Sequence, residues 1–156
     1  RNSGFPQTSL EKMQMKCIAY NGGYKYQLKE AYGVEIEIRP TSPIVTEYIG
    51  LDTEGKLTIA KGYAWDGPSG PTIDTLTFMR GSLVHDALYQ LMREGHLDHD
   101  VHREAADRIL QRICKEDGMC SLRAWWVYQG VHLFADPAAD PASKRPVTRA
   151  PKGCQP

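Results

Sequence analysis

The sequence predicts an α+β domain in which an N-terminal antiparallel β meander is followed by a Gly/Pro loop and three helices. Three observations predict this order. Apolar and polar residues alternate up to about residue 60, which is the period of a strand with one buried face. After residue 80 the apolar residues recur at helical spacing. Between the two patterns, the segment Asp66-Gly67-Pro68-Ser69-Gly70-Pro71 has the composition of a loop.

Strands are predicted where the alternation is regular. Residues 24–28 and 34–38 each place apolar side chains on one face and polar side chains on the other. Residues 45–49 and 56–60 follow as two further strands, and the turn Asp52-Thr53-Glu54-Gly55 joins them as a hairpin. Neighbouring strands joined in this way predict the meander.

The three helices are predicted from apolar stripes within residues 84–92, 101–113 and 125–134. Acidic and hydroxyl side chains favour helix starts, whereas glycine favours helix ends. The residues expected to begin or end these helices are Gly95, Asp98 or Asp100, Gly118, Ser121 and the pair Asp136-Pro137.

We expect a single domain over residues 13–136. A chain of 156 residues is long enough to bury a core of this size. Residues 1–12 precede two plausible natural starts, Met13 and Met15, so we expect them to be an upstream or tag segment. Residues 137–156 are rich in proline and positive charge, and we expect them to wrap the surface or to stay loose.

The charge balance and the hydropathy argue against two kinds of partner. The chain has 19 Lys and Arg residues against 19 Asp and Glu residues, so nucleic acid is not an expected partner. No apolar run approaches the roughly 20 residues that cross a bilayer, so no transmembrane segment is expected. The four cysteines show no Cys-x-x-Cys spacing and favour free thiols in a reducing compartment, with a pair between Cys114 and Cys120 left open.

The most informative stretch is Gly81-Ser82-Leu83-Val84-His85-Asp86-Ala87-Leu88-Tyr89, on the first predicted helix. His85 and Tyr89 are four residues apart and share a helix face, whereas Asp86 points to another side of the same turn. The glycines of the preceding loop allow backbone carbonyls to turn inward at positive φ. Calcium takes six to eight oxygen ligands, so Asp86 and the loop carbonyls suit this ion, and His85 beside them can act as a base.

A histidine that acts as a base needs its other ring nitrogen held by an acceptor. Asp107 is the best candidate, because it lies on the second helix at a distance from the connecting turn similar to that of His85. Tyr89 could then donate a hydrogen bond to the same carboxylate. The alternatives are an ion pair of Asp107 with Arg103 or Arg108, and a His85 that is only a partly buried helix residue beside a surface acid.

These residues together resemble the phospholipase A2 pattern, which has a glycine-rich calcium loop, a His-Asp-x-x-Tyr helix and an aspartate on an antiparallel helix. In that family the histidine activates a water and the calcium polarises the ester carbonyl. The resemblance implies a catalytic set of His85 as the base, Asp107 as its orienter and Tyr89 as support. It also implies calcium ligands from Asp86, Trp65, Gly67 and Ser69.

The chain between residues 15 and 135 also resembles a family of small phage and prophage proteins without an assigned function, domain of unknown function 1353. The residues that carry this resemblance are Gly23–Leu28, Trp65-Asp66-Gly67-Pro68-Ser69, the His-Asp-x-x-Tyr helix and Arg103-Glu104-Ala105-Ala106-Asp107. The resemblance implies a phage or prophage origin. It also implies a location in the host cytoplasm or in the virion.

The expected function is calcium-assisted ester hydrolysis, with phospholipid as one candidate substrate and water as the nucleophile. Such an enzyme needs an apolar approach surface, for which Trp65, Leu76 and Phe78 lie on the right segment. The alternative is a non-enzymatic virion, structural or host-interaction protein, whose interface could use the aromatic residues 125, 126 and 128.

Two other metal sites are weaker alternatives. His96, His99 and His102 are spaced three residues apart, as zinc ligands on a helix can be. They are expected to straddle a loop and a helix start, which separates their side chains. His85-Asp86 could also be the pair of an HD-type metal phosphohydrolase, but no histidine precedes His85 to complete that site.

Overall fold

The structure, a computed structural model, describes residues 18–20, 26–67, 76–134 and 148–150. The chain divides into two compact units, of which the first comprises Arg1–Gly23 and Arg145–Pro156. In its described part, β1 (Ile18–Tyr20) pairs antiparallel with β8 (Thr148–Ala150). β8 therefore lies within residues 137–156, the segment that we expected to be loose or to wrap the surface.

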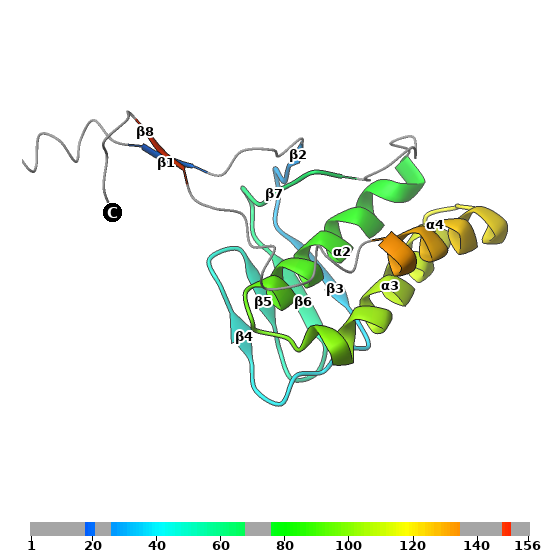
Figure 1. Cartoon of the computed structure of the whole chain (residues 1–156), viewed down its shortest axis with the longest axis horizontal. Coiled ribbons are helices and arrows are strands. Elements are labelled where there is room, and N and C mark those ends of the chain that lie inside the picture. Colours follow the sequence, from blue (N-terminus) through cyan, green and yellow to red (C-terminus); the bar gives the residue numbers. More distant parts are fainter. Residues whose placement is uncertain (1–17, 21–25, 68–75, 135–147, 151–156) are drawn as a thin grey trace, which may run out of the picture. The chain divides into compact units, whose positions relative to one another are not determined.

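The second unit, Tyr24–Lys144, begins with antiparallel strands in two sheets (Figure 1). The four-stranded sheet contains β3 (Tyr32–Glu35), β4 (Ile44–Val45), β5 (Ile49–Leu51) and β6 (Lys56–Ile59), in the order β3-β6-β5-β4. A separate short ladder pairs β2 (Tyr26–Gln27) with β7 (Ala64–Trp65). The predicted α+β class is confirmed, and β4, β5 and β6 form a meander, but β3 lies at the far edge beside β6 rather than beside β4.

The strand predicted over residues 45–49 is wrong, because a turn divides it into β4 and β5. The hydroxyl of Thr46 donates to the carbonyl of Ile49 over 3.0 Å and accepts a bond from the Ile49 backbone N–H over 3.0 Å. A threonine hydroxyl can give the backbone such a local alternative to strand pairing. The alternation over residues 34–38 extends beyond its strand, since Ile36 and Ile38 are buried although β3 ends at Glu35.

The turn between β5 and β6 forms where it was predicted. The carboxylate of Asp52 accepts hydrogen bonds from the backbone N–H groups of Glu54 at 2.9 Å and Lys56 at 2.8 Å. The bond from Lys56 is the main reason why the pKa of Asp52 lies below its ordinary value. Gly55 has a φ of 91°, and its carbonyl accepts a bond from the backbone of Ile36.

We expect Gly55→Ala to destabilise the protein by about 1–3 kcal/mol, more than Gly95→Ala does. Both glycines have positive φ, so both substitutions carry the strain of a left-handed backbone. A Cβ at Gly55 would also overlap the backbone carbonyl of Ile36, whereas a Cβ at Gly95 meets nothing within 4 Å. Urea unfolding of the two variants measures the difference, and equal losses would contradict this account.

The described helices are α2 (Leu76–Arg93), α3 (His99–Glu116) and α4 (Ser121–Phe134). The predicted caps are confirmed at Gly95, which follows α2 with a φ of 78°, and at Asp98, whose carboxylate accepts from the N–H of Val101 at 3.2 Å. Gly118 follows α3 with a φ of 98°. The predicted end at residues 136–137 lies outside the described residues.

The core brings α2 and α3 close together. The larger buried cluster joins the four-stranded sheet to these two helices, and a smaller one joins α2 and α3 to α4. A Cβ at Gly81 of α2 would lie 2.8 Å from Leu110 Cδ1 and 2.9 Å from Cys114 Sγ of α3, so the absence of a side chain permits this approach. His85 lies one turn after Gly81 on α2, and Asp107 lies about one turn before Leu110 on α3. The two residues therefore come opposite each other.

Candidate active site

A buried hydrogen-bonded set of three side chains connects α2 to α3. The Nε2 of His85 lies 2.7 Å from Oδ1 of Asp107, and the hydroxyl of Tyr89 donates to the same oxygen over 2.6 Å. All three residues are buried, Asp107 completely. The structure therefore brings together His85 and Asp107, which the sequence predicted to lie at similar heights on facing helices. It adds Tyr89, the expected hydrogen-bond donor to the same carboxylate.

The other oxygen of Asp107 faces two residues. Oδ2 lies 3.5 Å from Nδ1 of His132 on α4 and 3.9 Å from Nη1 of Arg103. Arg103 also donates a hydrogen bond of 2.7 Å to the backbone carbonyl of His132. Sequence reasoning missed His132. The one available indication was its position four residues after Tyr128, on the same face of the predicted third helix.

The geometry identifies which nitrogen of His85 can act as a base. With Nε2 held by Asp107, the neutral ring carries its proton there and keeps the lone pair on Nδ1. That nitrogen lies 4.0 Å from Oδ1 of Asp86. Burial alone lowers the pKa of His85, but the hydrogen bond to Asp107 and the nearby carboxylate of Asp86 outweigh it, so the pKa lies above the ordinary value.

Tyr89 is held in its donor form. Burial, followed by the hydrogen bond to Asp107, raises the pKa of its phenol well above the ordinary value, and Arg103 opposes this shift only in part. The phenol therefore stays protonated over any working pH. Its ring centroid lies 4.1 Å from that of His85, so it also packs against the imidazole that it helps to position.

We expect the unfolding free energy of the wild-type protein to fall between pH 6 and pH 9 by more than that of His85→Gln. A folded-state pKa above the unfolded value of about 6.5 means that protonated His85 contributes stability below pH 6.5. That contribution is lost as the pH rises through the folded pKa. Urea unfolding of both proteins in calcium-free buffer at the two pH values measures the difference. Equal decreases in unfolding free energy for the two proteins would contradict the prediction.

The residues proposed as calcium ligands occupy different environments. The side chain of Asp86 is 31% exposed beside His85. Gly67 has a φ of 75° and packs so closely on the ring of Tyr26 that a Cβ would overlap it. Trp65 belongs to strand β7 rather than to the loop, and its indole N–H donates to the hydroxyl of Ser82 over 3.2 Å. Ser69 lies outside the described residues.

These surroundings fit calcium only if backbone oxygens supply most of the ligands. Among the described residues, no group of three or more His, Cys, Asp or Glu side chains could hold a metal ion. Asp86 is one carboxylate, and calcium accepts carbonyl oxygens and water for the remainder of its shell. The zinc alternative finds no cluster in this part of the chain either, since His96 lies in the loop after α2 while His99 and His102 lie in α3.

The prediction that Trp65 and Phe78 belong to an apolar approach surface is wrong, because both side chains are buried. Leu76, at the start of α2, is exposed. Exposed apolar side chains gather instead on α4, at Leu122, Trp125, Trp126 and Leu133. Their spacing places them along one side of that helix. In the described residues no helix is both long enough and apolar enough to cross a bilayer.

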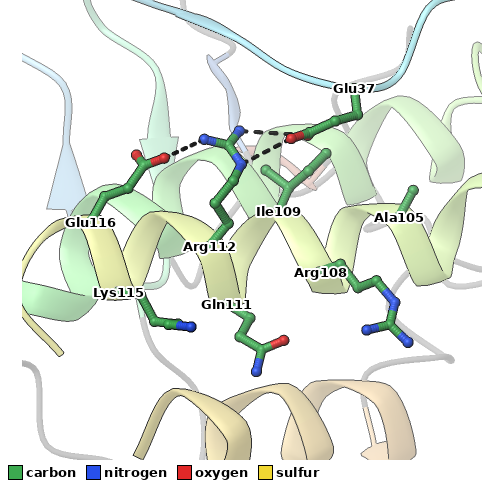
Figure 2. A pocket seen from close by; sticks show the side chains of 8 residues that line it. All are labelled: Glu37, Ala105, Arg108, Ile109, Gln111, Arg112, Lys115 and Glu116. Atoms are coloured by element: carbon green, nitrogen blue, oxygen red, sulfur yellow. Dashed lines mark hydrogen bonds and ion pairs between the residues drawn. The ribbon is translucent and has the colours of Figure 1, made fainter. Parts of the chain in front are cut away.

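A groove of about 760 Å³ is lined by residues of α3 and by Glu37 (Figure 2). The guanidinium of Arg112 lies in it between two carboxylates, 3.0 Å from Glu37 and 2.5 Å from Glu116. Neither His85 nor Asp107 lines this groove. The carboxylates of Glu37 and Glu116 that line the groove are both paired with Arg112.

Comparison with known proteins yields one match. Residues 44–131 match the sequence profile of a family described as Protein of unknown function (DUF1353). The matched segment runs from β4 into α4 and includes His85, Tyr89 and Asp107. No curated protein matches the chain, and no solved structure matches it.

Proposed function

The chain belongs to the DUF1353 family of proteins of unknown function, so we propose its activity from the site itself: metal-assisted hydrolysis of an ester, with calcium as the metal and a mechanism like that of phospholipase A2. One observation carries the proposal. The buried imidazole of His85 is held by Asp107 through Nε2, which leaves Nδ1 as a base on the side of the partly exposed Asp86.

In the proposed reaction a water molecule is the nucleophile. Neutral His85 takes a proton from the water at Nδ1 while the water oxygen forms a bond to the ester carbonyl carbon. Asp107 stabilises the imidazolium that results, and Tyr89 keeps the carboxylate in place. The tetrahedral intermediate then expels the alcohol, which receives the proton from His85, so that one C–O bond forms and one breaks. General-base catalysis of this kind is worth about 10²–10⁴-fold in rate.

The proposed calcium ligands are the carboxylate of Asp86 and backbone oxygens of Trp65, Gly67 and Ser69. Calcium bound there would stabilise the negative charge that develops on the carbonyl oxygen. The position of Asp86 immediately after His85 supports this arrangement, because the base and the metal ligand then share one helical turn.

The test is the release of fatty acid from mixed micelles of phospholipid and detergent. We expect release in the presence of calcium, loss of release when a chelator removes the calcium, and recovery when excess calcium is added. Asp86→Asn should raise the calcium concentration needed for half-maximal rate. Absence of release in every condition, or release that ignores calcium, would contradict the proposal.

A second candidate is a non-enzymatic virion or host-interaction protein, and the exposed Trp125 and Trp126 on α4 favour it. Aromatic side chains are enriched in protein interfaces relative to other surfaces. Under either function we propose a phage or prophage origin, on the sequence resemblance given above, and a location in the host cytoplasm or the virion. Stable incorporation into purified virions, without hydrolysis of any ester, would favour this candidate over the enzyme.

A further inference from the structure

The carboxylate of Asp107 is bonded unevenly. Its Oδ1 accepts hydrogen bonds from both His85 and Tyr89, whereas its Oδ2 is buried and has no hydrogen-bond partner. The Nδ1 of His132 is also buried without a hydrogen-bond partner, and it lies 3.5 Å from that oxygen. Two buried polar atoms that face each other in this way are each costly unless they bond.

We infer that His132 is a positioning residue of the site: its ring carries a proton on Nδ1, and this N–H donates a hydrogen bond to Oδ2 of Asp107. Asp107 is then held by an imidazole from α2 on one oxygen and by an imidazole from α4 on the other. A movement of about half an ångström brings the two atoms within ordinary hydrogen-bond distance. With the opposite tautomer, two acceptors would face each other in a buried site.

The ring of His132 makes one contact of its own, and two further contacts hold the groups around it. It stacks on Tyr128, with centroids 5.3 Å apart and planes inclined by 13°. Arg103 donates to the carbonyl of His132, one of the last carbonyls of α4, which have no partner inside the helix. Arg108 lies 5.0 Å above the other partner of the stack, Tyr128. The side chain of His132 is 32% exposed, so these contacts rather than burial orient it beside Asp107.

The consequence for the site rests on the proposed function. A carboxylate with hydrogen bonds on one oxygen only can rotate about its Cβ–Cγ bond. Such a rotation of Asp107 would carry the bonded imidazole of His85 with it. A donor on the second oxygen fixes the plane of the carboxylate and therefore the direction in which Nδ1 of His85 points. A misplacement of about 1 Å at a catalytic group can cost up to about a hundredfold in rate.

The first test reads the proton directly, in the intact protein labelled with ¹⁵N-histidine. We expect the long-range ¹H–¹⁵N spectrum of the His132 ring to show a proton on Nδ1, and we expect Asp107→Asn to change that signal. A neutral His132 ring with its proton on Nε2 alone would overturn the inference. This readout needs no substrate, so it stands even if the protein hydrolyses no ester, in which case only the proposed function fails.

The second test uses two variants of His132. His132→Phe keeps a ring to stack on Tyr128 but has no donor, whereas His132→Asn places an amide N–H where Nδ1 was. We expect His132→Phe to lower kcat for fatty acid release about tenfold with little change in KM, and His132→Asn to recover most of the loss. Equal rates for His132→Phe and the wild type would overturn the inference. Equal losses in both variants would also overturn it, because packing alone would then explain the effect.

Discussion

We expect His85→Gln to lower the rate of calcium-dependent ester hydrolysis by about 10²–10⁴-fold. The amide nitrogen of glutamine can occupy the place of Nε2 and keep the hydrogen bond to Asp107, so the buried network stays satisfied. The substitution removes Nδ1, which is the proposed base, and replaces it with nothing that can accept a proton. The measurement is the initial rate of fatty acid release at saturating calcium, with the unfolding midpoint in urea determined on the same preparation.

The matched control is His96→Gln. His96 lies in the loop between α2 and α3, and its side chain is 42% exposed. The same chemical change there should leave both the rate and the unfolding midpoint near those of the wild type, because surface substitutions away from special features change stability by less than about 0.5 kcal/mol. If His85→Gln kept the rate of this control, general-base catalysis by His85 would have to be abandoned.

The helical half of the fold could be predicted because its rules are local. Gly95 and Asp98 act at their own helix ends, and their short connection requires α2 and α3 to run antiparallel. Once that is given, equal distances from the turn place His85 opposite Asp107. The central feature of the site therefore follows from spacing along two regular helices.

The sheet could be predicted only in part, because strand pairing depends on residues far apart in the sequence. The alternation at residues 34–38 correctly indicated a buried face, but nothing in it specified that β3 would pair with β6. Residues 45–49 are divided into two strands by a turn in which both the hydroxyl and the backbone N–H of Thr46 bond to the carbonyl of Ile49. The alternation of apolar and polar residues does not detect a single turn-forming side chain, and β propensity is strongly context-dependent.

The same limit explains the errors at the site. Trp65 and Phe78 are buried and Trp126 is exposed, although all three are large aromatic residues for which the sequence alone allows either position. His132 approaches Asp107 because α4 packs on α3, and the sequence does not specify the rotation of α4 about its own axis. The residues that could not be predicted are those whose place is set by the packing of a third element.

We expect Asp107→Ala to destabilise the protein by about 3–5 kcal/mol, the largest stability loss among these variants. The substitution leaves the hydroxyl of Tyr89 and the Nε2 proton of His85 buried without an acceptor. It also removes the carboxylate that lies 3.9 Å from Nη1 of Arg103. Urea unfolding followed by tryptophan fluorescence measures the loss.

Two further variants separate the causes of that loss. Asp107→Asn keeps the shape and one acceptor oxygen, so it should lose about 1–3 kcal/mol, the range for a buried polar group that is left imperfectly paired. Glu104→Ala removes an exposed carboxylate one turn earlier on α3, where it pairs with Arg108, and should lose far less, because exposed ion pairs contribute little to stability. If Asp107→Ala lost no more than Glu104→Ala, the buried network would not connect α2 to α3. His85 would then lack the rigid partner that its proposed role requires.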